Sequence, residues 1–482
     1  MKTHGSSDTS TAAGLVNRLK VDTWDVLVIG GGNAALCGAI TARRRGATVL
    51  VVEAAPKFYR GGNSRHTRNL RLAHGKTNGM LTGSYSEEEF WQDLVNVTQG
   101  SLDESLSRFL VAESKELWDF MTSLGVRFQP PISGTLSLGR TNAFFLGGGR
   151  TLVNSLYMTA EDAGIDILYE TEVVDLDMRD GRFQSAIVRR YGEDHVVKAR
   201  AMVAAAGGFQ ANIDWLRESW GPAADNFRIR GTPYNRGSLL KVMLSKGVEQ
   251  IGAPDQCHAV AIDARAPKFD GGIATRLDCI VFGIVVNENA QRFYDEGEGF
   301  WPARYAIWGR LVAAQPNQIA HVIIESNATE LFMPSIFPAI EADTLEKLAS
   351  MIELDPIALR QTVDEFNRAV KSGAFDPAEL DDCHTEGLDP PKSHWARTIE
   401  HGPFQAYPLA PGITFTYMGV RVNREARVVM DNDQPAENIF AAGEIMAGNI
   451  LGQGYLAGTG MTIGAVFGRL AGTEAARYVA DH

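Results

Sequence analysis

The stretch Asp25-Val26-Leu27-Val28-Ile29-Gly30-Gly31-Gly32-Asn33-Ala34-Ala35 decides the fold. Its first half is apolar, as in a buried parallel strand, and three glycines then lead into an Ala-rich helical segment. Gly30 and Gly32 fill the first two positions of a G-x-G-x-x-G/A fingerprint, and Ala35 fills the third. A side chain at this turn would block a pyrophosphate from the backbone, and the positive end of the helix dipole favours phosphates. The stretch therefore predicts a dinucleotide-binding strand–turn–helix unit.

A second apolar segment, Thr48 to Val52, ends in Glu53. An acid about 20 residues after the fingerprint can hydrogen-bond a ribose hydroxyl. A lone glycine fingerprint is a weak signal, but strand, fingerprint, helix, strand and acid occur here in the required order. The sequence predicts dinucleotide binding, and a Gly-rich turn without a ligand is the alternative.

Length and charge narrow the class of protein. The chain has 482 residues, which exceeds the usual size of one domain, so two or three domains are expected. It carries 46 basic and 58 acidic residues, and the net charge of −12 argues against binding nucleic acid or an anionic membrane. Four scattered cysteines form no C-x-x-C pair, so the sequence predicts no iron–sulfur cluster, no haem and no metal site.

The first residues have no targeting pattern. Residues 1–22 are polar and rich in Ser and Thr, and they lack the apolar core of a signal peptide. No run in the chain approaches the ~18 apolar residues of a membrane span. We therefore expect a flexible N-terminal tail and a cytoplasmic location.

Two more glycine clusters lie in the first half of the chain. Gly61-Gly62-Asn63-Ser64 follows Glu53 closely; its glycines permit close approach, and its last two residues offer short polar side chains. The segment Ala201 to Ala206 ends in Gly207-Gly208, which again indicates a strand-to-turn junction. Taken singly, each cluster has a turn between packed elements as its alternative.

The C-terminal part repeats the pattern. Asn438 to Ala442 leads into Gly443-Glu444, and the Gly-rich stretch 452–462 opens a helix expected to run to about Tyr478. Four clusters in this order fit FAD better than NAD, because a helix N-terminus beside the flavin C2 carbonyl would stabilise negative charge on the reduced ring. The predicted cofactor-binding residues are Gly30, Gly32, Asn33, Ala34, Glu53, Gly61, Gly62, Asn63, Ser64, Val173, Ala206, Gly207, Gly208, Gly443, Glu444, Gly458, Thr459, Gly460, Met461 and Thr462.

These motifs resemble the FAD-dependent fumarate reductase/succinate dehydrogenase flavoprotein superfamily, from about Asp25 to the C-terminus. Within the superfamily they are most similar to the tricarballylate dehydrogenases. The segments that carry this resemblance are 60–69 (RGGNSRHTRN), 140–149 (RTNAFFLGGG), 292–298 (RFYDEGE), 300–302 (FWP), 304–310 (RYAIWGR) and 443–449 (GEIMAGN).

The resemblance implies an α/β fold: a Rossmann-like FAD-binding domain of the glutathione-reductase type, with an inserted α+β capping domain. The middle third mixes short strand-like runs (279–287 and 319–325) with amphipathic helical segments (344–352 and 355–372), which fits a cap. The expected division is a tail at 1–22, the N-terminal part of the FAD domain at 23–251, the cap at 252–403, and the C-terminal part of the FAD domain at 404–482.

The resemblance also bears on how the flavin is held. Succinate dehydrogenases of this superfamily attach FAD to a histidine just after the glycine-rich loop. Here Asn63 and Ser64 occupy that neighbourhood, and His66 lies slightly downstream. We therefore predict non-covalent FAD, with a covalent bond to His66 as the alternative.

Desaturation of a polycarboxylate needs a base that removes a proton and a cation that stabilises the carbanion-like transition state. Arginine suits carboxylates because its planar fork binds two oxygens at once. Five basic residues gather within twelve positions of the flavin-side loop, in a chain that is acidic overall, and a solvated surface is the alternative for them. They are Arg60, Arg65, His66, Arg68 and Arg71.

Arg304 is the first catalytic candidate, and its role is implied by resemblance. Soluble fumarate reductases place a proton-transferring arginine shortly after an Arg-Phe-x-x-Glu segment, and here Arg304 follows 292–296 at a slightly longer interval. An arginine base needs neighbouring groups to relay its proton, because its ordinary pKa lies above ~12. A surface or ion-paired arginine is the alternative.

Three departures from fumarate reductases concern the substrate. Those enzymes carry a histidine on the strand after a Pro-Gly turn, where this chain has 413–417 (ITFTY), and a substrate-binding arginine near the final helix, where this chain has Tyr455. Both dicarboxylate clamps are thus missing. Conversely, Arg276 stands where those enzymes have an acid, which adds a cation of the kind that a third carboxylate requires.

The remaining candidates have structural alternatives. Tyr455 could donate to a carboxylate or assist proton transfer, as a tyrosine does in ketosteroid dehydrogenases of the superfamily, or it could pack the cap against the FAD domain. His258 lies near the position of a substrate histidine, although a lone histidine is often structural. Arg140 is a further pocket candidate. The predicted catalytic residues are Arg304, Tyr455, Arg276, His258, Arg140 and Arg68.

The leading functional hypothesis is an FAD-dependent dehydrogenase that oxidises tricarballylate to cis-aconitate. Electrons would pass to a separate acceptor protein, which the resemblance implies to be a membrane-associated iron–sulfur protein, with peripheral docking at the inner membrane. The alternatives are a desaturase or reductase of another substrate, ketosteroid-like or another carboxylate, and a non-catalytic flavoprotein that only relays electrons.

Overall fold

The computed structural model describes residues 14–19, 22–75, 78–131, 138–269, 272, 275–299 and 301–482. The flexible tail expected at 1–22 lies mostly outside these ranges. Its described part differs from the expectation, because residues 14–18 are helical and both Leu15 and Leu19 are buried in the core.

The larger sheet begins with the stretch that decides the fold. Strand β1, which is buried from Val26 to Ile29, pairs in parallel with β2 on one side and with β9 on the other. The order across the sheet is β20-β21-β9-β1-β2-β6. Only the edge strand β20 runs antiparallel on this path. The hairpin β7–β8 joins this sheet through the antiparallel pairing of β8 with β9. The strands are β1 (Thr23–Ile29), β2 (Val49–Val52), β6 (Asp166–Leu168), β7 (Thr171–Arg179), β8 (Arg182–Arg190), β9 (Glu193–Ala204), β20 (Arg427–Val429) and β21 (Pro435–Ala441).

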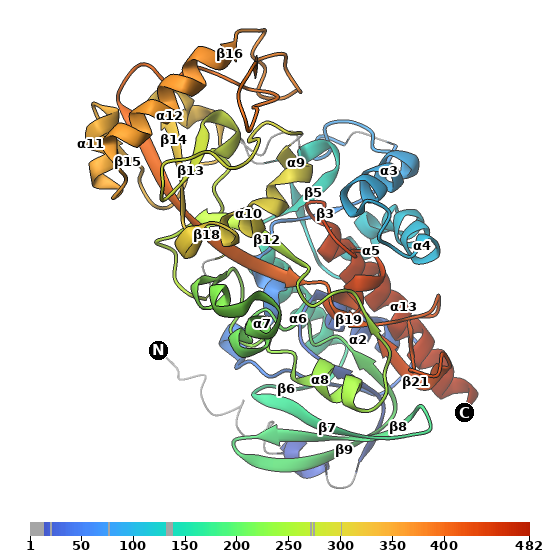
Figure 1. The fold of residues 1–482 in the computed structure, drawn as a ribbon. Coiled ribbons are helices and arrows are strands. Elements are labelled where there is room, and N and C mark those ends of the chain that lie inside the picture. The colour runs from blue at the N-terminus through green and yellow to red at the C-terminus, as the bar shows by residue number, and fades with distance from the viewer. Residues whose placement is uncertain are drawn as a thin grey trace, which may run out of the picture.

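Two helices from opposite ends of the chain pack side by side against this sheet (Figure 1). They are α2 (Asn33–Arg44) and α13 (Thr459–Asp481), which runs slightly beyond its expected end. Glycines let the helices approach closely: a Cβ added at Gly468 would collide with the Ala34 carbonyl oxygen, and one at Gly472 with the Gly38 carbonyl oxygen. The first and last elements of the fold therefore form one unit.

A second sheet, built mainly from the middle of the chain, has the order β10-β18-β14-β13, with β12 and β15 also paired to β18. The long strand β18 pairs with β14 through 404–409 and with β12 through 409–416. The strand thus begins at the expected domain limit of 403/404, but its pairing lies within the second sheet. The limits drawn from the sequence stay a prediction. The strands are β10 (Arg228–Ile229), β12 (Cys257–Asp263), β13 (Ile284–Asn287), β14 (Ala320–Glu325), β15 (Ile340–Ala342) and β18 (Phe404–Thr416).

The far end of this sheet carries its own small core, where α11 (Leu345–Met351) and α12 (Pro356–Ala369) pack on β13 and β14 (Figure 1). Shorter elements complete the fold. The helices are α3 (Glu87–Thr98), α4 (Glu104–Ser114), α5 (Leu117–Ser123), α6 (Gly148–Asp162), α7 (Ile213–Trp220), α8 (Ser238–Ser245), α9 (Trp301–Arg304) and α10 (Trp308–Ala313). The strands are β3 (Asn69–Arg71), β4 (Phe128–Gln129), β5 (Asn142–Phe145), β11 (Gln250–Ile251), β16 (Val370–Lys371), β17 (His384–Thr385) and β19 (Gly419–Val420).

Candidate active site

A cavity of about 1500 Å³, counted with its open mouth, lies where the two sheets meet. Its walls come from the turn after β1, the loop 61–69, the end of β9, strand β18, and the residues before and at the start of α13. Its lining extends from the turn after β1 to the start of α13, which suits an elongated ligand with two parts.

The three glycines of the turn after β1 have different roles. Gly30 has φ 114°, and a Cβ there would collide with the Ala205 carbonyl, so this glycine lets β1 lie close to the end of β9. At Gly31 an added Cβ would collide with the Glu53 carboxylate and the Tyr157 hydroxyl. The cavity-facing Gly32 leaves bare backbone at the N-terminus of α2, where phosphates bind best.

Glu53 lies at the cavity wall as expected. Its side chain is buried, and Oε1 accepts a hydrogen bond of 2.8 Å from the Ala55 N–H. Burial raises the pKa of Glu53, and backbone N–H groups including that of Gly31 oppose the rise. The carboxylate is thus fixed beside the turn that would hold a nucleotide.

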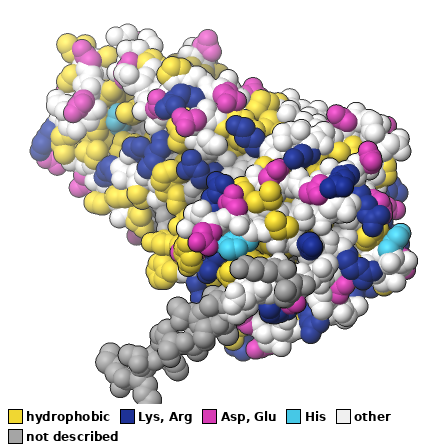
Figure 2. Space-filling model, turned by 90° about the horizontal axis from the view of Figure 1, so that it is seen from below, with side chains coloured by type: hydrophobic (Ala, Val, Ile, Leu, Met, Phe, Trp, Pro, Cys, Tyr) yellow, Lys and Arg dark blue, Asp and Glu magenta, His cyan; other side chains and the backbone are white. Residues whose placement is uncertain are grey.

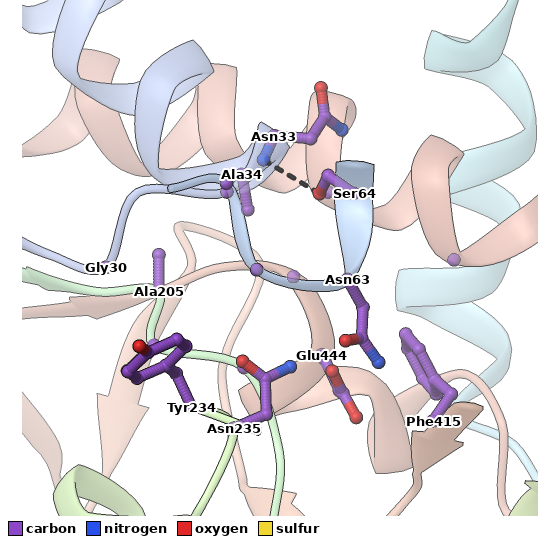
Figure 3. A pocket seen from close by; sticks show the side chains of 18 of the residues that line it. Gly30, Asn33, Ala34, Asn63, Ser64, Ala205, Tyr234, Asn235, Phe415 and Glu444 are labelled. Atoms are coloured by element: carbon purple, nitrogen blue, oxygen red, sulfur yellow. Dashed lines mark hydrogen bonds between the residues drawn. The ribbon is translucent and has the colours of Figure 1, made fainter. Parts of the chain in front are cut away.

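Two asparagines tie the walls together (Figure 3). The Asn33 backbone N–H donates to Ser64 Oγ at 3.0 Å, and its side-chain Nδ2 donates to the Met461 carbonyl at 3.0 Å. Asn63 Nδ2 donates to the Thr414 carbonyl at 2.6 Å. These bonds connect the first helix, the glycine-rich loop, the last helix and β18 around one space.

Most of the predicted cofactor-binding residues line this cavity. Gly208, Thr459 and Thr462 do not. A Cβ at Gly208 would collide with Thr416 Oγ1, so this glycine is required for packing. Thr459 is buried, and Thr462 Oγ1 donates to the Arg71 carbonyl at 2.5 Å. The lining residues are Gly30, Gly32, Asn33, Ala34, Glu53, Gly61, Gly62, Asn63, Ser64, Val173, Ala206, Gly207, Gly443, Glu444, Gly458, Gly460 and Met461.

Glu444 brings a buried acid to the same wall. Its Oε1 accepts a hydrogen bond of 2.9 Å from the Thr416 N–H, and Gln210 Nε2 lies 3.5 Å from Oε2. Burial raises the pKa of Glu444 to about 7. The group therefore changes charge near neutral pH.

One end of the cavity is a chamber lined by three buried arginines, Arg68, Arg230 and Arg276. Burial lowers the pKa of Arg68 to about 9 and that of Arg230 to about 10, and repulsion from Arg276 adds to both shifts. Among the described residues, neither Arg68 nor Arg230 pairs with a carboxylate. We refer to this end of the cavity, with its three arginines, as the arginine chamber.

Arg276 differs from the other two because it has a counterion. Its Nη2 lies 2.7 Å from Asp278 Oδ2, and both side chains are buried. Asp278 also accepts a hydrogen bond of 2.8 Å from Trp301 Nε1. The guanidinium lies over the Tyr305 ring at 4.5 Å, and its Nε has no hydrogen-bond partner among the described residues. Arg276 therefore keeps a donor for a ligand.

His258 and Tyr455 form a stacked pair in the chamber wall, with ring centroids 3.9 Å apart and planes 9° from parallel. Neither His258 nitrogen has a hydrogen-bond partner among the described residues. Burial, with Arg230 and Arg276 nearby, holds the pKa of His258 well below its usual value, so the ring is neutral. Tyr455 Oη accepts a hydrogen bond of 3.0 Å from the Gly460 N–H at the start of α13.

Two predicted catalytic arginines lie outside the cavity lining. Arg304 Nη2 forms an ion pair with Glu298 and lies 3.2 Å from the Tyr294 hydroxyl. Arg140 is half exposed and pairs with Glu89 at 2.9 Å, so the expectation of a pocket residue disagrees with its position. Both arginines lie away from the cavity for the same reason, which is that a nearby surface carboxylate holds each guanidinium in an ion pair.

Sequence reasoning missed Arg230 and Tyr305, which both line the chamber. Tyr305 directly follows Arg304 in a motif that is recognisable in the sequence. The prediction chose Arg304 from this motif, but it is Tyr305 that lines the cavity. Arg230 lies between β10 and the Gly231-Thr232 turn, and an isolated arginine beside a turn is too common a pattern to single out.

The described part of the chain contains no group of three or more His, Cys, Asp or Glu side chains that could hold a metal ion. None of its helices combines the length and hydropathy needed to cross a bilayer.

Comparison with known proteins gives the site its context. The family model described as "FAD binding domain" matches residues 25–461. The chain belongs to this FAD-binding family. It is 28% identical to the fumarate reductase (cytochrome) of Shewanella frigidimarina over 95% of this chain and 78% of that protein.

Solved structures agree on the fold. The open conformation of a flavocytochrome c3 fumarate reductase superposes with a TM-score of 0.72 at 23% identity, covering 99% of this chain and 82% of that one. A 3-ketosteroid-delta4-(5alpha)-dehydrogenase from Rhodococcus jostii RHA1 gives 0.71 at 23% identity, covering 95% and 97%. The predicted α/β FAD-binding fold is confirmed.

The predicted cofactor, FAD, is confirmed by the family. The residues present also fit it. Bare backbone at Gly32, the N-terminus of α2 and the Glu53 carboxylate suit a diphosphate and a ribose, and the long cavity continues to the start of α13. The chain is thus an FAD-dependent oxidoreductase of this family.

Proposed function

We propose that this flavoprotein is a dehydrogenase that acts on a CH–CH bond of a polycarboxylate, oxidising tricarballylate to cis-aconitate. One observation carries the proposal: three buried guanidinium groups surround one cavity, and the only carboxylate that pairs with any of them among the described residues is Asp278.

Buried charges without counterions are costly, because a cation loses its hydration in the interior. A ligand with several carboxylates would offset that cost at the arginine chamber and gain charge-assisted hydrogen bonds. An uncharged ligand would leave Arg68 and Arg230 unpaired. The chamber is therefore suited to a polyanion.

The chain's own groups can bind the cofactor and orient the substrate. The turn 30–32, Glu53, Asn63, Ser64 and the start of α13 would hold FAD. When bound, FAD supplies a two-electron acceptor that takes a hydride from a carbon of the substrate. The arginines fix the carboxylates, and the charge of Arg276 stabilises the negative charge that develops as the proton leaves the adjacent carbon.

A proton acceptor is needed in the same chamber, and we assign this role to Tyr455, which accepts the proton as its phenolate. Its hydroxyl oxygen is buried at the cavity; burial raises the pKa of Tyr455 on balance, while the Gly460 N–H and Arg230 oppose the rise and stabilise the phenolate. The resemblance implies Arg304 instead. Arg304, however, lies outside the cavity lining and is held by Glu298 in an ion pair.

The sequence leaves two other functions open. A ketosteroid-like substrate is favoured by Tyr455 and by Phe415 at the strand opposite His258, but such a ligand has no charge for the arginines. A non-catalytic electron relay would be favoured by Arg276 in solvent, yet this side chain is only 6% exposed. We further propose that a separate protein, an iron–sulfur protein at the membrane, receives the electrons.

An anaerobic titration of the oxidised holoprotein tests the proposal. Tricarballylate is expected to bleach the flavin band, whereas succinate and a ketosteroid are not. Bleaching by the steroid alone would support the alternative substrate, and bleaching by none of the three would support the relay. Either result would overturn the proposed function.

A further inference from the structure

We propose that Arg230, held in place by Thr414, forms the subsite for the third carboxylate and so selects tricarboxylates over dicarboxylates. This inference rests on the proposed function. It concerns a residue that neither the sequence motifs nor the family resemblance singles out.

Arg230 is fixed at a junction between the two halves of the site. Its backbone N–H donates to the Ile413 carbonyl at 2.8 Å, next to the short parallel pairing of β10 with β18. Its side chain donates from Nη1 to Thr414 Oγ1 at 2.8 Å and from Nε to the Gly272 carbonyl at 3.2 Å. Both acceptors are neutral, so this 4% exposed guanidinium keeps its full charge.

A β-bulge explains how Thr414 can hold it. His258 pairs with Phe415 and Ala259 with Ile413, so Thr414 is the extra residue on β18 and is released from the ladder. Its carbonyl accepts from Asn63 Nδ2 at 2.6 Å, while its hydroxyl accepts from Arg230. The bulge thus ties Arg230 to the same loop that lines the cofactor end of the cavity.

The three arginines are not equivalent. Arg276 is partly neutralised by Asp278, whereas Arg68 forms no ion pair among the described residues and its Nη1 lies 3.3 Å from Met333 Sδ. Arg276 and Arg68 suffice for two carboxylates. Arg230 adds a separately anchored cation, and its charge can be satisfied only by a further anionic group of the ligand.

Binding of the unsaturated products to the oxidised holoprotein tests this inference without turnover. The probes are cis-aconitate, with three carboxylates, and fumarate, with two. Calorimetric dissociation constants are compared for the wild type, Arg230→Gln and Thr414→Val. Arg228→Gln is the matched control, because this arginine lies on the same short strand and does not line the cavity. Flavin content and circular dichroism check that each variant is folded.

Arg230→Gln is expected to weaken cis-aconitate binding about 10- to 100-fold, the range for a lost charged hydrogen bond, while fumarate changes less than about threefold. Thr414→Val should shift the ratio in the same direction by a smaller factor, because it loosens Arg230 without removing the charge. Arg228→Gln should leave the ratio unchanged.

Equal weakening of both ligands in Arg230→Gln, or an unchanged ratio, would overturn the inference. The proposed function fails in a different way, namely if wild-type protein binds neither acid. A wild type that binds cis-aconitate tightly, together with an Arg230→Gln variant that does the same, would refute the subsite alone.

Discussion

Tyr455 and Arg304 make different predictions at the level of single residues. Tyr455→Phe should retain FAD and polycarboxylate binding but slow flavin reduction by tricarballylate roughly 10²- to 10⁴-fold, because the variant cannot accept the proton. Arg304→Ala should slow it less than about tenfold. Anaerobic stopped-flow absorbance measures both rates. A larger loss in Arg304→Ala would move the proton-transfer role to that arginine.

Glu444 predicts a pH dependence of stability. Its pKa in the folded chain is about 7, above the ordinary 4.5, so the folded state favours the protonated form. The stability that this protonation provides is fully present below about pH 4.5 and is lost as the pH rises through 7. Glu444→Gln should remove this loss, which amounts to up to roughly 3 kcal/mol.

Urea unfolding of both proteins at pH 5 and pH 8 measures the effect. The wild type should lose more unfolding free energy between the two pH values than Glu444→Gln does. The amide can still accept from the Thr416 N–H, and Gln210 Oε1, which has no partner among the described residues, can accept from its NH₂ group. An identical pH dependence in the two proteins would show that Glu444 stays charged.

At the scale of single residues, the sequence predicts those positions whose residue type is imposed by the local backbone, such as a tight turn. Gly30, Gly32 and Glu53 were recognisable because a phosphate-binding turn imposes them in a fixed order. Arg230 was not, because its place in the chamber depends on strand pairing between positions almost 200 residues apart. Arg140 was assigned to the pocket because its motif was recognised, while the Glu89 that holds it lies on another element.

Among the elements, the turn between β1 and α2 is where added volume would affect the cofactor directly. Gly32→Val should abolish FAD retention, because its branches would occupy the space of the pyrophosphate beside Ser64 and Gly61. The ratio of flavin to protein absorbance after purification measures this. Gly75→Val is the control, since a Cβ there meets nothing within 4 Å. Normal flavin content in Gly32→Val would mean that the phosphates lie elsewhere.

The packing of α2 on α13 gives a prediction whose sign is opposite to helix propensity. Replacing a helical glycine by alanine usually stabilises a helix by about 1 kcal/mol. Gly468→Ala should instead lower the unfolding free energy by about 1–3 kcal/mol, because the added Cβ would collide with the Ala34 carbonyl oxygen. Chemical denaturation measures it, with Gly75→Ala as the neutral control; a stabilised Gly468→Ala would show that the helices can separate freely.

For the whole molecule, the prediction of non-covalent FAD remains to be tested. The flavin should leave the chain on acid denaturation, and the intact mass should equal that of the polypeptide alone, because the glycine-rich loop is followed by Asn63 and Ser64 in place of an attaching histidine. His66 lines the cavity and is the residue that a covalent bond would use. A mass increased by one flavin, absent in His66→Ala, would show that the attachment is covalent.

The fold as a whole was more predictable than the site. Hydrophobic pattern and glycine spacing indicate the parallel sheet, and the two-ended cofactor domain follows from clusters at both ends of the chain. The position of β18 was not predictable, because its apolar run suits either sheet and only the pairing partners decide. On the face in Figure 2, basic and acidic side chains are interspersed. Neither this mixed surface nor the net negative charge of the sequence indicates that three arginines are buried around one cavity.

The joining of the two chain ends has a consequence for biosynthesis. One wall of the cavity is made by residues 30–69 and the facing wall includes residues 443–464, so a nascent chain on the ribosome cannot close the site until its last helix has emerged. Folding of the earlier segments alone would leave the turn after β1 without its facing wall. Flavin capture therefore waits for the synthesis of α13, and a polypeptide released before α13 would be colourless however well the preceding segments had folded.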